Sequence, residues 1–90
     1  MEFEFDEDKR LKNIEKHGID FLAAKILFDD QHLRMPAKTV DGEQRWLAIG
    51  TIDDVYVTAV FAMRGSVIRI ISTRRARNDE RKKYQEVFGG

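Results

Sequence analysis

The period of the hydrophobic pattern changes near residue 30, and this change restricts the fold more than any other feature. Before it, apolar residues recur as on one side of a helix, most clearly at Phe21, Ala24 and Phe28. After it, apolar and polar residues alternate, as along a strand. The pattern therefore predicts a helical first part followed by a sheet.

Two helices are predicted before the change of period, and residues at their ends favour them. Asp6 is the expected N-cap of a helix over residues 7–17. Gly18 is its expected C-cap, because glycine tolerates the left-handed conformation. Asp20 is expected to cap a second helix, which ends near residues 29–30.

Short segments with the alternation or the β-branched content of strands are residues 3–5, 33–39, 45–52, 55–64 and 67–72. Pro36 cannot donate a ladder hydrogen bond, so its segment is expected at an edge of the sheet. Asp41-Gly42 predicts a hairpin turn, since both residue types tolerate positive φ. Apolar residues on both sides of the segment 55–64 predict a central strand.

A last helix is predicted over residues 78–87, with Asn78 as its cap. The predicted order is a short strand, two helices, an antiparallel β-meander and a C-terminal helix, which is an α+β fold with helices packed on a curved sheet. Ninety residues fit one domain, so we expect a single domain over residues 1–90. The chain has no cysteine, so packing rather than disulfides must hold it together.

Several classes of function are excluded by what the sequence lacks. There is no thiol nucleophile, no Cys-ligated metal site and no glycine-rich phosphate loop. Asp29, Asp30 and His32 are typical of a solvated helix exit rather than a metal site, so we expect no metal and no cofactor. The acidic N-terminus lacks the apolar run of a secretory signal, and no segment is long enough to cross a membrane. A cytoplasmic protein is therefore expected.

The formal net charge of zero conceals a charge gradient along the chain. The net charge is −4 over residues 1–30, −1 over residues 31–60 and +5 over residues 61–90. Six of the eight cations in residues 64–83 are arginine, which suits bidentate contact with phosphate. Three lysines of the first predicted helix share one side: Lys9, Lys12 and Lys16. The gradient favours a polyanionic or acidic partner, and its alternative interpretation is a solvated charged surface.

The remaining polar residues are a plausible set for cleaving RNA without a metal. Such cleavage needs a base for the 2′-hydroxyl proton, cations for the phosphate charge and an acid for the leaving oxygen. Candidates for base and acid are His17, Glu43 and Glu80, and candidates for phosphate binding are Arg45, Arg64, Arg69 and Arg74. His17 also suits a structural role at a helix C-terminus, and Glu80 suits the first turn of its helix. Arg74 and Arg75 are expected in a loop after the last strand.

A series of short motifs runs in order along nearly the whole chain. Its first part is Phe3-Glu4-Phe5-Asp6, Lys9, Asn13, Lys16-His17-Gly18-Ile19, Phe21, Ala24 and Phe28-Asp29. Its second part is Glu43, Arg45, Gly50, Arg64-Gly65, Ile68-Arg69-Ile70-Ile71-Ser72, Arg74, Ala76, Glu80, Arg81 and Tyr84. In this order the motifs resemble those of the BrnT toxins. One departure is Phe61-Ala62-Met63, where that family often has Tyr-Thr-Glu, so any role of a hydroxyl or carboxylate there is lost.

The resemblance implies a toxin of a type II toxin–antitoxin pair, with a fold like that of the RelE ribonucleases, which cuts RNA and inhibits translation and growth. It also implies a cognate ribbon-helix-helix antitoxin and a complex that binds operator DNA. The catalytic candidates are Lys16, His17, Glu43, Arg64, Arg69 and Arg74. The RNA-binding candidates are Lys9, Lys12, Arg45, Arg75 and Arg81. The alternative is a non-enzymatic adaptor whose basic side binds an acidic protein segment or nucleic acid.

Overall fold

The first helix begins and ends where its capping residues predict. The computed structural model describes residues 1–89 and places helix α1 at Glu7–His17. The Asp6 carboxylate accepts a hydrogen bond from the backbone N–H of Lys9 at 3.0 Å. Gly18 adopts the left-handed conformation, with φ of 71°, and its N–H donates to the carbonyl of Ile14.

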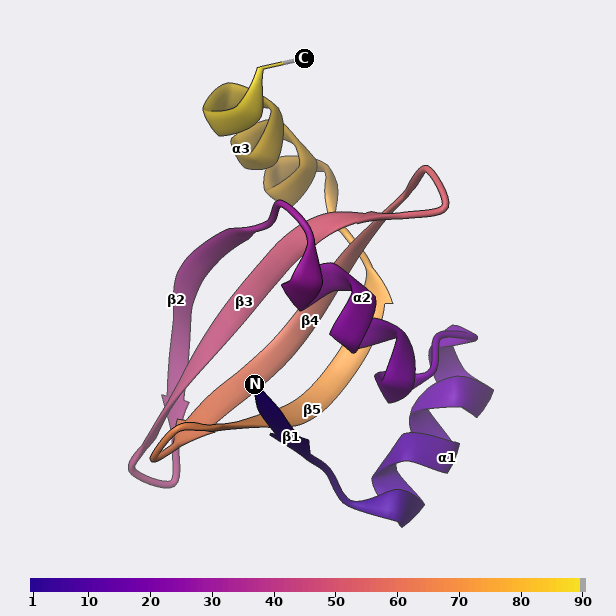
Figure 1. Cartoon of the computed structure of the whole chain (residues 1–90), viewed down its shortest axis with the longest axis vertical. Helices are drawn as coiled ribbons and strands as arrows, with labels where there is room; N and C mark the ends of the chain where they lie inside the picture. Colours follow the sequence, from indigo (N-terminus) through magenta and orange to yellow (C-terminus); the bar gives the residue numbers. More distant parts are fainter. Residues whose placement is uncertain (90) are drawn as a thin grey trace.

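The second helical segment begins with a tighter turn than the sequence predicts. Asp20 caps it, accepting from the backbone N–H of Leu22 at 3.0 Å. The first turn is a 3₁₀ helix, η1, at Phe21–Ala23, and it continues into the short helix α2 at Ala24–Asp29. Together they form one rod that lies across the sheet (Figure 1).

The five strands form one sheet in the order β1-β5-β4-β3-β2. Their bounds are Glu2–Glu4 for β1, Leu33–Val40 for β2, Glu43–Ile52 for β3, Val55–Arg64 for β4 and Val67–Arg75 for β5. Strand β1 pairs with β5 in parallel, and the other pairs are antiparallel. The α+β prediction, the central position of β4 and the edge position of β2 are thus confirmed.

Two predictions near the C-terminus are wrong. Strand β5 continues to Arg75, because Arg74 and Arg75 pair with Thr58 and Val57 of β4, so these arginines lie in the sheet and not in a loop. The N-cap of helix α3 (Asn78–Phe88) is Arg77 rather than Asn78. The reason is that Glu80 accepts the hydrogen bond of the Arg77 backbone N–H at 2.9 Å, and this contact fixes the first turn.

A β-bulge in β5 determines which side chains share a face of the sheet. Val60 pairs with Ser72 and the next residue of β4, Phe61, pairs with Ile70, so Ile71 has no partner in β4. In a strand without a bulge, Arg69 and Ser72 would point to opposite faces, since an odd number of positions separates them and side chains alternate along a strand. With it, they share one side, which we call the arginine face: Arg45, Arg64, Arg69, Ser72 and Arg74.

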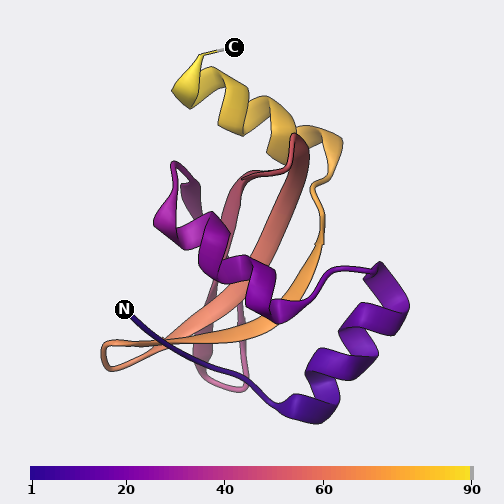
Figure 2. The same ribbon diagram turned by 45° about the vertical axis from the view of Figure 1, so that its right-hand side comes forward.

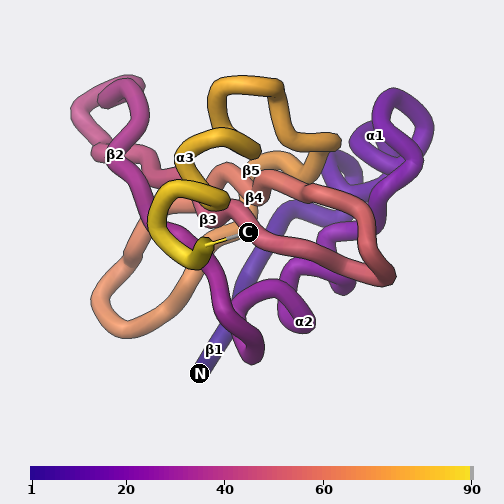
Figure 3. The backbone as a smooth tube through the Cα atoms, turned by 90° about the horizontal axis from the view of Figure 1, so that it is seen from above, coloured from indigo at the N-terminus to yellow at the C-terminus, as the bar shows by residue number. Residues whose placement is uncertain are grey.

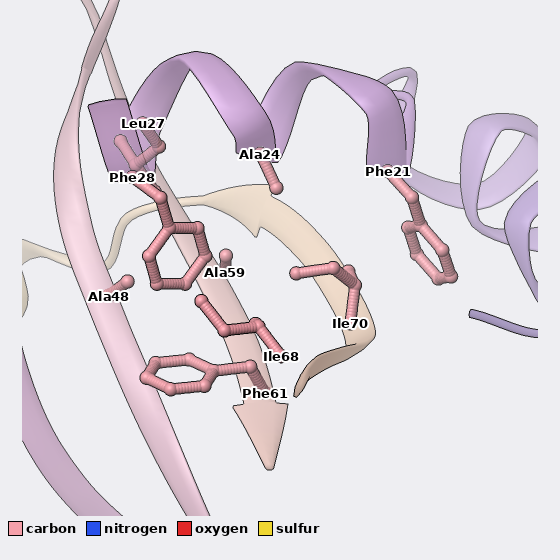
Figure 4. Close-up of a cluster of buried hydrophobic side chains, with 9 residues drawn as sticks. All are labelled: Phe21, Ala24, Leu27, Phe28, Ala48, Ala59, Phe61, Ile68 and Ile70. Carbon is pink, nitrogen blue, oxygen red and sulfur yellow. The ribbon is translucent and has the colours of Figure 1, made fainter. Parts of the chain in front are cut away.

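The hydrophobic core lies on the other side of the sheet, beneath η1 and α2 (Figure 4). The buried cluster comprises Phe21, Ala24, Leu27, Phe28, Ala48, Ala59, Phe61, Ile68 and Ile70. The rings of Phe28 and Phe61 meet edge to face, with their centroids 5.0 Å apart. Gly50 allows the close approach of α2 to β3, because a Cβ there would lie 2.7 Å from Cδ1 of Leu27.

Helices α1 and α3 lie at different ends of the molecule, as the turned view shows (Figure 2). In the view from the α3 end, that helix crosses above the end of the sheet (Figure 3). Tyr84 of α3 packs edge to face against Tyr56 of β4 at 5.6 Å and contacts Phe88 of its own helix. None of the helices in residues 1–89 combines the length and the apolar composition that a bilayer crossing requires.

Candidate functional site

Asn13 fixes α1 against the edge of β5. Strand β1 pairs only with Val67 to Arg69, so the later part of that edge lacks a neighbouring strand. The buried amide of Asn13 replaces one: its Nδ2 donates to the carbonyl of Thr73 at 2.9 Å and its Oδ1 accepts from the backbone N–H of Thr73 at 3.3 Å. Its Oδ1 also accepts from the hydroxyl of Ser72 at 3.2 Å. Because both backbone groups are satisfied, α1 is held at a fixed position beside the strand.

A second contact orders the corner after α1. The guanidinium of Arg10 donates from Nε and Nη2 to the two carboxylate oxygens of Asp20, at 2.8 and 2.9 Å. These hydrogen bonds lower the pKa of Asp20 and raise that of Arg10. The contact holds Asp20 to α1 across the turn that contains His17 and Gly18.

A shallow groove of about 220 Å³ runs between α1 and the bulged part of β5. We call it the α1 groove, and it is lined by Lys9, Lys12, Asn13, Lys16, His17, Ile71 and Ser72. The three lysines are exposed, and within residues 1–89 none of them forms an ion pair. The groove therefore presents three uncompensated ammonium groups beside an imidazole and a hydroxyl.

The arginine face carries a looser set of ion pairs. Nε of Arg64 lies 3.2 Å from the Glu43 carboxylate, and Nη1 of Arg69 lies 3.8 Å from that of Glu4. Arg64 is half-exposed, and pairs of this kind contribute at most about 1 kcal/mol to stability. Nε of Arg45 is buried and makes no hydrogen bond within the described part of the chain. These arginines thus remain available to a stronger anionic ligand.

Arg69 and Ser72 connect the arginine face with the α1 groove. The hydrogen bond from the Lys9 N–H is the main reason why the pKa of Asp6 is lowered, and the charge of Arg69 adds to the effect. Arg69 is therefore close to the N-terminus of α1. Ser72 lines the groove and belongs to the arginine face. We call the cations of α1 and of the arginine face together the basic band, in which the carboxylates of Glu4 and Glu43 also lie.

Arg74 is engaged in a buried contact that holds α3 to the sheet. Its guanidinium donates to both carboxylate oxygens of Glu80, at 2.8 and 2.9 Å, and the Thr58 hydroxyl donates to the same carboxylate at 2.9 Å. Burial opposes the ionisation of Glu80, but hydrogen bonds from Arg74, the Arg77 backbone and Thr58 outweigh it and lower its pKa to about 2. Glu80 is thus ionised at neutral pH and is a poor candidate for a catalytic acid or base.

Arg75 and Arg81 lie around hollows at the end of β4 and β5. Arg75 and His17 line a hollow of about 430 Å³. Arg75 and Arg81 line a second one of about 220 Å³, where the Arg81 guanidinium lies 4.8 Å from the centre of the Tyr56 ring. The structure therefore brings together two groups of the predicted residues: one around α1 and the end of β5, and one on the arginine face.

The sequence does not predict the contacts that form only when the helices, turns and strands pack together. Asn13 and Thr73 lie 60 positions apart, and no local pattern marks their contact. The pairing of Arg10 with Asp20 depends on the turn between α1 and η1, and that of Arg74 with Glu80 depends on how α3 meets the sheet. Within residues 1–89, no three His, Cys, Asp or Glu side chains gather as they would around a metal ion.

Comparison with known proteins agrees with the resemblance of the motifs. Residues 5–80 match the family described as "Ribonuclease toxin, BrnT, of type II toxin-antitoxin system". No curated protein matches the chain. The match covers most of the chain, from the residue before the α1 cap to the buried glutamate of α3. The chain therefore belongs to the BrnT family of ribonuclease toxins of type II toxin–antitoxin systems.

Proposed function

We propose that residues 1–90 act as a single toxin domain that cleaves RNA without a metal ion, with the α1 groove as the site of cleavage. The observation that carries this proposal is the composition of the groove, in which Lys9, Lys12 and Lys16 lack anionic partners within the described chain and lie beside His17. A phosphodiester supplies the negative charge that these ammonium groups lack.

His17 is suited to act as the general base of the reaction. In the proposed step, the imidazole takes the proton of a 2′-hydroxyl and the 2′-oxygen forms a bond to the adjacent phosphorus. The bond from phosphorus to the 5′-oxygen breaks, and that oxygen receives a proton from Lys16. Lys9 and Lys12 stabilise the negative charge that builds up on the phosphate oxygens during the step.

The arginine face extends the proposed contact with RNA beyond the groove. Arg45, Arg64 and Arg69 offer guanidinium groups that hold only exposed or distant carboxylates, so phosphates can replace these partners. Glu43 keeps Arg64 in place in the absence of RNA. Arg74 contributes indirectly, because its pairing with Glu80 holds α3 against the sheet.

Membership of the family implies an antitoxin partner. We propose that this partner belongs to the ribbon-helix-helix class and neutralises the toxin by covering the basic band with an acidic segment. The complex of the two then binds operator DNA through the antitoxin. In its free form, the toxin cuts cytoplasmic RNA and thereby inhibits translation and growth.

Incubation of purified, antitoxin-free protein with RNA in the presence of EDTA tests the activity. Cleavage in EDTA is expected, with products whose ends carry a 2′,3′-cyclic phosphate or its hydrolysis product and a 5′-hydroxyl. Intact RNA with a folded protein would contradict the proposal. RNA that is bound tightly and never cut would favour the adaptor function instead.

Induction of the gene in cells tests the biological role. Growth and protein synthesis should stop after induction and should resume when the adjacent antitoxin gene is induced as well. Continued growth with an accumulating folded protein would argue against a toxin.

A further inference from the structure

Three hollows lie next to one another around the end of β5, and they share lining residues. His17 lines both the α1 groove and the hollow of about 430 Å³, which we call the central hollow. Arg75 lines both the central hollow and the smaller hollow beside Arg81. A chain-like ligand can therefore pass from the lysines of α1, by way of His17 and Arg75, to Arg81.

The walls of the central hollow are mostly aliphatic, and polar groups lie among them. The apolar lining residues are Ile19, Ala23, Ile52, Val55 and Val57. Its volume falls within the range of roughly 300–1,000 Å³ that is typical of small-ligand sites. A small ligand with apolar faces and polar edges matches this lining.

Of the charged and titratable groups in this hollow, two are free to meet a ligand. The carboxylate of Asp20 is fully engaged by Arg10 and by the N–H of Leu22. Within residues 1–89, in contrast, the side chains of His17 and Arg75 form no ion pair. The free groups are thus the imidazole of His17, which can form hydrogen bonds, and the planar guanidinium cation of Arg75.

We propose that the central hollow receives one nucleobase of single-stranded RNA, with the adjoining phosphates held by the α1 groove on one side and by Arg75 and Arg81 on the other. The proposal rests on the proposed ribonuclease function and adds a substrate subsite to it. Single-stranded RNA is recognised by turning unstacked bases into such sites, with hydrogen bonds to their edges and guanidinium planes against their faces. The base in the hollow then selects which phosphodiester lies beside His17, and so gives the enzyme a sequence preference.

Filling the hollow tests this subsite without removing any polar group. Ala23→Leu adds a larger side chain to its wall, and Val55→Phe fills it from the side of the sheet. Ala37→Leu, on the edge strand β2, is the matched control outside the hollow. Cleavage sites are mapped by sequencing the products from an RNA pool of random sequence. Both filled variants should lose the base preference of the wild type and show at least a tenfold higher KM, and the control should match the wild type.

A binding measurement on the wild-type protein separates this proposal from the proposed function. A short oligonucleotide with 2′-deoxy linkages, which cannot be cut, is added during NMR observation of methyl groups. The methyl signals of Ile19, Val55 and Val57 should shift, and inorganic phosphate alone should leave them unchanged. If RNA is never cut but these methyls shift, the ribonuclease function fails and the subsite stands.

Two outcomes overturn the subsite. The first is an unchanged base preference in folded filled variants, combined with methyl signals that do not respond to the oligonucleotide. The second is a response of these methyls to the antitoxin alone, with weaker antitoxin binding by Ala23→Leu and unaltered RNA cleavage. That second result would assign the hollow to a protein partner.

Discussion

The lysines of α1 and Arg74 of β5 are all cationic, but their surroundings in the structure are opposite. Arg74 donates to both carboxylate oxygens of Glu80, and its side chain is 16% exposed. Lys9, Lys12 and Lys16 are exposed and have no anionic partner within residues 1–89. A cation that the fold has already paired in a buried contact stabilises it, and the exposed cations without such a partner are the ones that we propose to bind RNA. A count of basic residues does not distinguish the two.

The largest effect is expected at His17, which we propose as the general base of the reaction. His17→Ala should reduce RNA cleavage at least about 100-fold, because general acid–base groups typically contribute about 10²–10⁴-fold. Single-turnover cleavage assays measure the loss. His32→Ala is the matched control, since His32 hydrogen-bonds to Asp30 and Arg34 outside the groove. A large fall in melting temperature for His17→Ala would mean that its role is to end α1.

Glu80→Ala should have the next largest effect, and it should act on stability. The substitution leaves Arg74 and Thr58 without their buried partner, and such a loss typically costs about 3–5 kcal/mol. Urea unfolding followed by circular dichroism measures the free energy of unfolding. Glu86→Ala on the exposed side of α3 is the control and should change it little. A loss below 1 kcal/mol in the free energy of unfolding would contradict the conclusion that this contact holds α3 to the sheet.

Acid should weaken the same contact in a defined range of pH. The pKa of Glu80 is about 2 in the fold against 4.5 for an ordinary glutamate, so the folded state binds the proton more weakly. The resulting stabilisation, about 3 kcal/mol, is complete above pH 4.5 and is lost as the pH falls from 4.5 to 2. Unfolding free energies measured across this range should fall more steeply for the wild type than for Glu80→Gln. Parallel curves would show that other carboxylates dominate.

The smallest expected effect is that of a single lysine in the groove. Lys12→Ala should lower cleavage about tenfold and leave the melting temperature nearly unchanged, because the side chain is exposed and is proposed to contact only phosphate charge. Lys25→Ala, at an exposed position of α2 outside the groove, is the matched control. Equal activity of the two variants would remove Lys12 from the site. A melting temperature many degrees lower would assign it to the structure.

Local signals in the sequence predict most of the fold. The caps at Asp6, Gly18 and Asp20, the hairpin at Asp41-Gly42 and the central position of β4 follow from the preferences of a few neighbouring residues. These features succeed because their physical causes lie within a turn or two of the chain.

The site is less predictable because its geometry depends on contacts between distant segments. The candidate residues around α1 are brought together by Asn13, whose contacts with Thr73 span 60 positions of the chain. The pairing of Arg74 with Glu80 was missed, because strand β5 extends further than its residue types indicate. Residue propensities do not indicate that pairing with Val57 and Thr58 of β4 extends this strand to Arg75.

The unpaired Ile71 of β5 shifts the alternation of side chains by one position between the two halves of the strand. Deleting this single residue would give a regular strand in which Arg69, Ser72 and Arg74 still share one face, because simple alternation then connects the two halves. A pairing with β4 that kept Ile71 but had no bulge would instead turn one half over, so that either Arg69 or both Ser72 and Arg74 pointed toward the core beneath α2. The bulge therefore lets β5 hold one residue more than its partner strand without exchanging the chemistry of its two faces.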